Sequence, residues 1–329
     1  MPGFFTVSRL TLIINPVASS VTRQRAHMVH SALARAGDVR VVETERREHA
    51  TELAREAARM GADAVVVLGG DGAVNEVANG LTGTETALAP LPGGSTNVYA
   101  RTLGYDRRLS RAVHQLLEEL GTGSSRRVAL GSVESESANG APIKARRFCF
   151  HAGLGFDAAV VEWADGRPSF LKRHAAPPLF VAGTVATWRS THNLHDLQFD
   201  LALDGETVVE GVRFAIISNT SPYTYLGLRR LLVTPGGPSE GSLALTALTS
   251  LTLRSLAGAI GSALGAAKKL QHQETVEYRP EVKTISLEAK KPVPYQVDGE
   301  YLGRATELQF TCEPDSLTVI SPEKASDQQ

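Results

Sequence analysis

The first part of the chain repeats one pattern, in which a short apolar run alternates with a longer amphipathic segment. The apolar runs predict buried strands, at Leu10–Ile14, Val39–Thr44 and Ala64–Leu68. The segments between them carry apolar residues three and four positions apart and predict helices, at Thr22–Ala36 and His49–Met60. Strands that alternate with helices imply a parallel sheet with helices on both faces, which is a three-layer α/β domain.

The pattern changes near Gly131, after which turns and strand-like runs dominate. The predicted strands of this second part are Leu197–Leu203, Val208–Ser218, Leu243–Leu248, Val282–Leu287, Pro294–Val297 and Glu307–Thr311. Asp204-Gly205 joins the first two in the manner of a hairpin. We therefore predict an α/β domain at residues 6–131 and a mostly antiparallel β-sandwich domain at residues 132–312.

Composition narrows the class of protein. The 329 residues are 42% hydrophobic and 21% charged, with a net charge of −1. This net charge provides no general electrostatic attraction to nucleic acid, so we expect no nucleic-acid partner. The most apolar window, Leu243–Ala267, is interrupted by Arg254 and is predicted to be a strand and a core helix. With no signal peptide evident at the N-terminus, a cytoplasmic protein is expected. Cys149 and Cys312 lie in apolar runs and are expected to be reduced thiols.

The strand at Ala64–Leu68 ends in Gly69-Gly70-Asp71-Gly72 and turns directly into a helix. Glycines let backbone N–H groups approach phosphate oxygens, and the N-terminus of the following helix favours negative charge. Asp71 could reach a magnesium ion or a hydroxyl proton. Such a turn can also serve only to pack a helix closely on a sheet, and this alternative stays open for a single turn.

A second turn of the same kind follows the apolar run at Leu88–Leu91. It reads Pro92-Gly93-Gly94-Ser95-Thr96-Asn97 and adds two hydroxyl groups and an amide. The carboxyl ends of parallel strands meet at one edge of a sheet, so both turns are predicted to face one crevice that could hold a nucleotide.

With these two turns the chain resembles the diacylglycerol kinase-like lipid kinases, whose fold is shared with NAD kinases. Shorter matches extend the resemblance over most of the chain, at Asn15-Pro16, Gly153–Ala158, Glu240–Leu243 and Gln296–Glu300. The resemblance implies an ATP- and Mg-dependent kinase of a lipid hydroxyl, with diacylglycerol or a related lipid as the acceptor. It also implies transient peripheral contact with a membrane surface, and a last strand at about 315–321 that returns to the first domain. A homodimer is compatible with the sequence.

The resemblance also assigns residues to the nucleotide. Those implied to contact it are Asn15, Thr44, Gly69, Gly70, Asp71, Gly72, Ala73, Val74, Asn75, Gly94, Ser95 and Asn97. Asp71 would order magnesium and the γ-phosphate. Ala73 stands where the family usually has threonine, so one hydroxyl contact is missing.

The resemblance makes Glu300 the proton acceptor, with Asp298 shaping the turn that presents it. Asp-Gly followed by an acid is also an ordinary hairpin turn, and the chain contains a second copy at Asp204-Gly205-Glu206 that we interpret as only a turn. A structural cation is implied at Gly237, Glu240 and Ser242, where Glu240 replaces the usual aspartate. An ordinary turn acid is the alternative there.

Two other functions remain open from the sequence. One is phosphorylation of a soluble acceptor such as NAD, and the other is a nucleotide-binding regulatory protein that does not transfer phosphate. Retention of both Asp71 and Glu300 argues against the second.

Overall fold

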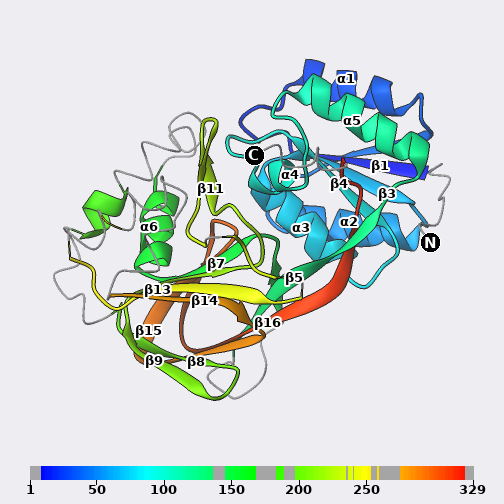
Figure 1. Cartoon of the computed structure of the whole chain (residues 1–329). Coiled ribbons are helices and arrows are strands. Elements are labelled where there is room, and N and C mark those ends of the chain that lie inside the picture. The colour runs from blue at the N-terminus through cyan, green and yellow to red at the C-terminus, as the bar shows by residue number, and fades with distance from the viewer. Residues whose placement is uncertain are drawn as a thin grey trace. The chain divides into compact units, whose positions relative to one another are not determined.

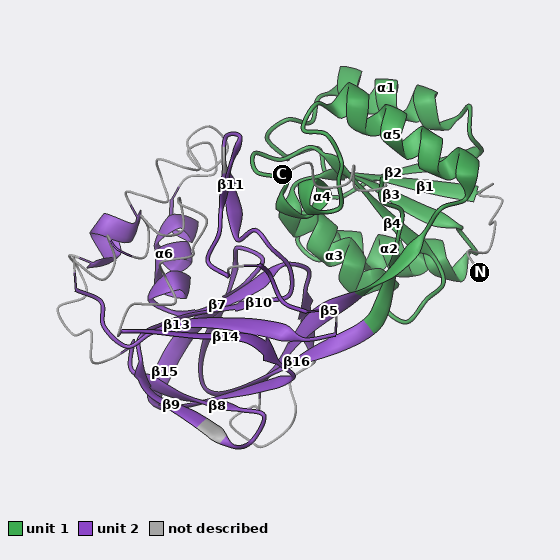
Figure 2. Ribbon diagram, in the orientation of Figure 1, with its two compact units in different colours: residues 1–128, 315–329 green, residues 129–314 purple. Residues whose placement is uncertain are grey.

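The computed structural model describes residues 9–135, 145–167, 183–188, 197–234, 236–239, 241–252, 258 and 275–322. The chain divides into two compact units, one of residues 1–128 with 315–329 and one of residues 129–314 (Figure 2). These are called unit 1 and unit 2. The functional roles assigned above to the two predicted domains stay predictions.

Unit 1 contains a parallel sheet. Its strands are β1 (Arg9–Ile14), β2 (Asp38–Glu43), β3 (Ala64–Gly69), β4 (Ala87–Pro92) and the end of β16 (Glu300–Val319). The order is β2-β1-β3-β4, and Val319 of β16 pairs in parallel with Leu88 of β4. The return of the last strand to the first part of the chain is therefore seen in the pairing.

Helices cover both faces of this sheet. They are α1 (Arg23–Leu33), α2 (His49–Arg59), α3 (Asp71–Leu81), α4 (Val98–Thr102) and α5 (Leu109–Thr122). α1 and α5 lie on one face, and α2 and α3 on the other (Figure 1). All six residues of β3 are buried, as expected for a strand covered on both sides. The three-layer α/β prediction is confirmed.

The predicted elements of unit 1 match the observed ones to within a few residues. The largest difference is at α1, which begins after Thr22 and ends at Leu33. The Thr22 hydroxyl caps the helix by accepting from Arg25 N at 3.2 Å. At the other end, the amides of Ala36 and Gly37 both bond to the Leu33 carbonyl, so the chain leaves the helix in a tight turn.

Unit 2 is built mainly of antiparallel strands. These are β5 (Arg126–Glu134), β6 (Arg146–Phe148), β7 (His151–Gly155), β8 (Phe199–Leu203), β9 (Thr207–Val212), β10 (Phe214–Ser218), β11 (Thr224–Leu226), β12 (Arg229–Leu231), β13 (Leu243–Leu248), β14 (Val276–Val282), β15 (Thr284–Val297) and most of β16. The main order is β14-β13-β10-β7-β15-β16, with β8 and β9 added at β15. The helix α6 (Phe156–Asp165) follows β7 directly.

Two predicted strands of unit 2 are interrupted. The run Val208–Ser218 is two strands, because at Arg213 the backbone N–H bonds to Leu248 O and the carbonyl accepts from Phe156 N. The run Val282–Leu287 breaks at Lys283, whose N–H bonds to the Asp204 carboxylate. Both predictions were wrong at these points because the apolar pattern continues through each break.

The hydrophobic window Leu243–Ala267 is described only in part. Leu243–Leu248 is strand β13, as predicted, whereas the predicted helix falls largely on residues outside the described ones. Among the described residues, no helix is long and apolar enough to cross a membrane. Cys149 and Cys312 are both free thiols, and Cys149 is buried.

Candidate active site

The two glycine turns of unit 1 lie against each other at the carboxyl ends of β3 and β4. The N–H of Gly93 donates to the carbonyl of Gly69 at 2.9 Å. A Cβ at Gly94 would lie 2.7 Å from the Gly70 Cα, closer than real Cβ atoms come. Gly93 and Gly94 are therefore required for the packing of one turn on the other, which is the structural role considered above.

Gly70 and Gly72 are under a different constraint. A Cβ at Gly70 would meet its nearest neighbour, the Gly94 Cα, at 3.5 Å, and a Cβ at Gly72 would meet nothing within 4 Å. The fold itself therefore does not demand glycine at these positions. Gly70 is the N-cap of α3, so the first amides of α3 lack acceptors within the helix and are available to an anion.

The second turn is closed by Asn97. Its side chain accepts from Gly94 N at 2.7 Å and donates to Gly94 O at 3.0 Å, and its backbone is left-handed with φ of 50°. Asparagine tolerates this conformation better than most residues. Ser95, at the tip of the same turn, is exposed. In this structure Asn97 therefore shapes the turn, and Ser95 is the side chain that can meet a ligand.

The Asp71 carboxylate joins the two turns. It accepts from the Thr96 hydroxyl at 3.0 Å and from Tyr99 N at 3.1 Å. Burial raises the pKa of Asp71, while hydrogen bonds from Val98, Tyr99 and Thr96 and the charge of Arg101 oppose that rise. The carboxylate is thus held at the start of α4, and its predicted contact with magnesium stays a prediction.

Asn15 and Thr44 follow β1 and β2 at the same edge of the sheet. The N–H of Asn15 bonds to Leu68 O at 3.0 Å, and the N–H of Thr44 bonds to Ile14 O at 2.9 Å. The Asn15 side chain accepts from Val17 N at 3.2 Å. The topology therefore brings both predicted residues to the edge that carries the glycine turns.

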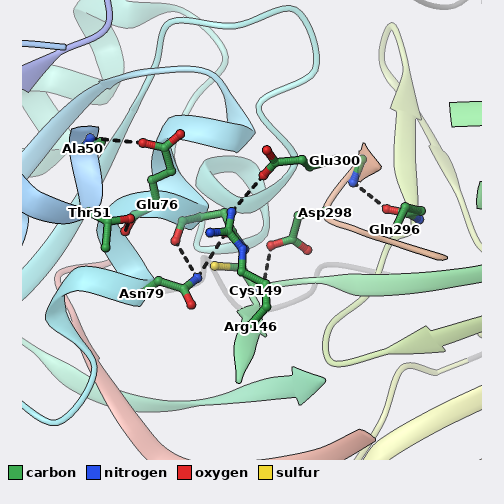
Figure 3. Close-up of polar contacts among 11 residues, drawn as sticks. Ala50, Thr51, Glu76, Asn79, Arg146, Cys149, Gln296, Asp298 and Glu300 are labelled. Atoms are coloured by element: carbon green, nitrogen blue, oxygen red, sulfur yellow. Dashed lines mark hydrogen bonds and ion pairs between the residues drawn. The ribbon is translucent and has the colours of Figure 1, made fainter. Parts of the chain in front are cut away.

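The next residues of the first turn face inward. Ala73, Val74 and Asn75 are all buried. Glu76 of the same motif accepts from Ala50 N at 3.0 Å and so caps α2, whose own N-cap residue makes no side-chain bond (Figure 3). The Glu76 contact joins α3 to α2, and the contacts of Ala73, Val74 and Asn75 with a nucleotide stay predictions.

Unit 2 carries the predicted proton acceptor on the turn between β15 and β16. Glu300 is the first residue of β16, and its carboxylate lies 2.8 Å from Nη2 of Arg146 (Figure 3). Both side chains are largely buried, with 24% and 18% exposed. Arg146 was not predicted, because it follows a polar loop that carries no motif. Glu300 and the glycine turns belong to different units, so their approach to each other stays a prediction.

The turn itself is anchored by Asp298. Its carboxylate accepts from the backbone N–H groups of Cys149, Phe150 and His151 at 2.7, 3.0 and 3.1 Å. Asp298 and Gly299 both have positive φ, of 48° and 80°. Asp204 and Gly205 have φ of 52° and 76°, so turn geometry does not distinguish the two Asp-Gly-Glu sequences. What distinguishes them is the surroundings, since Glu206 is exposed.

Behind this turn lies a buried polar group centred on Asp157. Its carboxylate accepts from the Tyr223 hydroxyl and from Gln296 Nε2, both at 2.8 Å. Burial raises the pKa of Asp157 to about 6, more than the two hydrogen bonds lower it. The His151 ring packs against the Tyr223 ring in a tilted arrangement with centroids 4.4 Å apart, and burial lowers the pKa of His151 to about 3. His151 is therefore neutral at physiological pH.

Lowering the pH from about 7 to about 5 is expected to stabilise the parent protein relative to Asp157→Asn. The folded pKa of about 6 lies above the ordinary 3.8, so between these values the folded state binds a proton that the unfolded state releases. The cost of the buried charge, roughly 3 kcal/mol above the folded pKa, falls to about half of that value by pH 5 and disappears only below the unfolded pKa of 3.8. Urea unfolding at both pH values measures this difference, and an equal difference at both would contradict the prediction.

The predicted structural cation site is described only in part. Gly237 has φ of 74°, and the Ser242 hydroxyl donates to Ser239 O at 2.8 Å, whereas Glu240 lies outside the described residues. The described residues contain no group of three or more His, Cys, Asp or Glu side chains that could hold a metal ion. The cation site stays a prediction.

Comparison with known proteins shows which proteins this chain is similar to. Residues 9–133 match the family model of the diacylglycerol kinase catalytic domain. A diacylglycerol kinase of Mycobacterium tuberculosis is 27% identical over 252 residues, covering 73% of each protein. The structure of a diacylglycerol kinase from Bacillus anthracis superposes with a TM-score of 0.68 at 20% identity, over 96% of this chain and 97% of that one. An NAD kinase from Archaeoglobus fulgidus in complex with ATP superposes at 0.50, with 13% identity and 96% and 94% coverage.

Proposed function

We propose, from the premise that this chain belongs to the diacylglycerol kinase-like lipid kinases, that it transfers the γ-phosphate of Mg-ATP to the hydroxyl group of diacylglycerol or a related lipid. Membership makes the chain a phosphotransferase with an alcohol acceptor. The lipid, the use of ATP with magnesium and the roles of individual residues are the proposed part.

The observation that carries the proposal is that packing does not require glycine at positions Gly70 and Gly72. Packing explains Gly93 and Gly94, but a Cβ at Gly70 would make only an ordinary contact at 3.5 Å, and a Cβ at Gly72 would lie in open space. An anion seated on the amides at the start of α3 accounts for glycine at both positions, because it needs that space. A triphosphate is an anion of this kind, and the exposed Ser95 hydroxyl lies on the neighbouring turn.

Phosphoryl transfer asks the protein mainly to position its reactants and to balance charge. In our proposal the amides of the first turn hold the phosphates. Asp71 keeps the two turns together and lies close to the phosphates. Magnesium commonly keeps several waters and is held by one or two carboxylates together with phosphate oxygens, so the Asp71 carboxylate fits such a site. When bound, magnesium would neutralise phosphate charge.

Glu300 is proposed to accept the proton of the lipid hydroxyl. Its carboxylate is held in one place by Arg146 at 2.8 Å and by the anchored turn that precedes it. A carboxylate fixed in this way can be within hydrogen-bond reach of an acceptor hydroxyl without having to be reoriented first.

Labelled phosphate from ATP is expected to enter diacylglycerol presented in mixed micelles, with little transfer to NAD or to short polyols. The reason is that the protein meets an acceptor with acyl chains at the surface of a micelle or membrane, whereas NAD is dissolved in water. Thin-layer separation and mass identification of the labelled product measure this. Robust transfer to NAD without lipid would favour the soluble-acceptor kinase, and ATP binding with no transfer to any acceptor would favour a regulatory protein.

A further inference from the structure

Asp157 is a carboxylate whose two oxygens are both engaged inside unit 2. It lies in the first turn of α6 and is 2% exposed. Oδ1 accepts from the Tyr223 hydroxyl, and Oδ2 accepts from Gln296 Nε2. A side chain at Gly153 would overlap this carboxylate, so the glycine of the preceding strand leaves room for it. The acid is therefore built into the fold and does not face an open acceptor pocket.

Gln296 connects Asp157, through hydrogen bonds, to the turn that carries Glu300. Its side chain is fully buried, and its Oε1 accepts from Gly299 N at 2.8 Å. The direction of the amide group is fixed by its two partners, because Nε2 must face the carboxylate and Oε1 must face an N–H. A continuous line of hydrogen bonds thus runs from Asp157 through Gln296 to Gly299, the residue next to Glu300.

We propose that Asp157 is a positioning residue, which sets the orientation of the Gln296 amide and thereby fixes the turn that presents Glu300. The effect on catalysis rests on the proposed function of Glu300 as proton acceptor. Asp298 anchors the turn on its other side through three backbone N–H groups. With both anchors in place, the backbone of the turn that carries Glu300 is held on both sides.

The direction of the hydrogen bonds supplies the test. In Asp157→Asn, the Tyr223 hydroxyl still donates to the one remaining side-chain oxygen, so the new amide group faces Gln296 with a donor. Gln296 must then turn and lose its bond to Gly299. In the double variant Asp157→Asn with Gln296→Glu, the asparagine donates to one glutamate oxygen and Gly299 N donates to the other. The line of hydrogen bonds is restored with only the bond between positions 157 and 296 reversed in direction, and one buried carboxylate is kept.

Two readouts are measured on the full-length chain. Exchange of the Gly299 amide with deuterium, in the absence of substrate, reports on the turn, and turnover with ATP and micellar diacylglycerol reports on its consequence. In Asp157→Asn we expect faster Gly299 exchange and a turnover number lower by about 10- to 100-fold, with the KM for ATP within about twofold. The double variant should recover most of both losses.

Ser132→Ala is the matched control for a loss of stability alone. Ser132 is buried in the same unit and bonds to the Thr311 hydroxyl at 2.7 Å, away from the line of hydrogen bonds. This variant should lower the unfolding temperature without changing Gly299 exchange. Should Asp157→Asn not fold, Gln296→Met removes the bond to Gly299 while keeping the side-chain volume, and the same two losses are expected.

The proposal is overturned if Gly299 exchange in folded Asp157→Asn or Gln296→Met equals that of the parent, or if the folded double variant recovers neither readout. Absence of lipid phosphorylation by the parent protein would instead refute the proposed function. Gly299 exchange would still decide the positioning role in that case, because it needs no substrate.

Discussion

Replacing Glu300 by glutamine is expected to lower the turnover number by about 10²- to 10⁴-fold, the usual contribution of a general base. Glutamine keeps the shape of the side chain and can still accept a hydrogen bond from Arg146, but it cannot take the proton of the acceptor hydroxyl. ATP affinity should hardly change, since the glycine turns belong to unit 1. Steady-state kinetics at saturating ATP and lipid measure the effect.

Glu206→Gln is the control that the chain itself provides. Glu206 follows Asp204-Gly205, a turn with nearly the same backbone geometry, and the Asp204 carboxylate likewise accepts backbone N–H groups, those of Lys283 and Thr284. Glu206 is exposed, and the variant should turn over like the parent. Near-normal turnover in Glu300→Gln, or a large loss in Glu206→Gln, would place the proton acceptor elsewhere.

Gly70→Val is expected to weaken ATP binding by about 10²-fold or more, because the side chain would occupy the space of a phosphate and remove charge-assisted hydrogen bonds. The protein should remain folded, since Gly70 has φ of −89° and its nearest neighbour leaves ordinary contact distance. Equilibrium binding of ATP, together with the unfolding temperature, measures both expectations.

Gly121→Val and Gly94→Ala are the two controls for this result. Gly121 lies in α5 with nothing within 4 Å of a Cβ, and its variant should bind ATP like the parent. Gly94→Ala would press against the Gly70 backbone and should lose stability as well as binding. Parent-like ATP affinity in folded Gly70→Val would remove the first turn from the nucleotide site.

The sequence was sufficient to predict the α/β sheet and the two glycine turns, because those features depend on local patterns. The apolar run of β3 and the Gly-Asp-Gly that follows it predict a buried strand and a turn before any partner is known. That β1, β3 and β4 run parallel to one another follows from the alternation of strands and helices. Asn15 and Thr44, which the family resemblance implied, follow β1 and β2 at the edge that carries the glycine turns, and their contact with a nucleotide stays a prediction.

Contacts between distant segments could not be predicted in this way. Nothing near Arg146 indicates that it pairs with Glu300, 154 positions along the chain. The cap that Glu76 forms on α2 and the line from Asp157 to Gly299 likewise depend on how the elements pack. The strand breaks at Arg213 and Lys283 are set by hydrogen bonds to other segments of the chain. The apolar pattern continues through both positions and does not indicate the breaks.

Strand β16 has a consequence for how the protein is made. Residues 9–133 match the catalytic domain family, yet the edge of β4 is paired by Val319, and the buried side chains of Leu317, Val319 and Ile320 complete the core there. During synthesis, the ribosome therefore releases β1 to β4 long before their last partner emerges. Until then β4 is an open, apolar sheet edge, the kind of surface that invites aggregation. A fragment that stops at residue 133 would keep that exposed edge permanently.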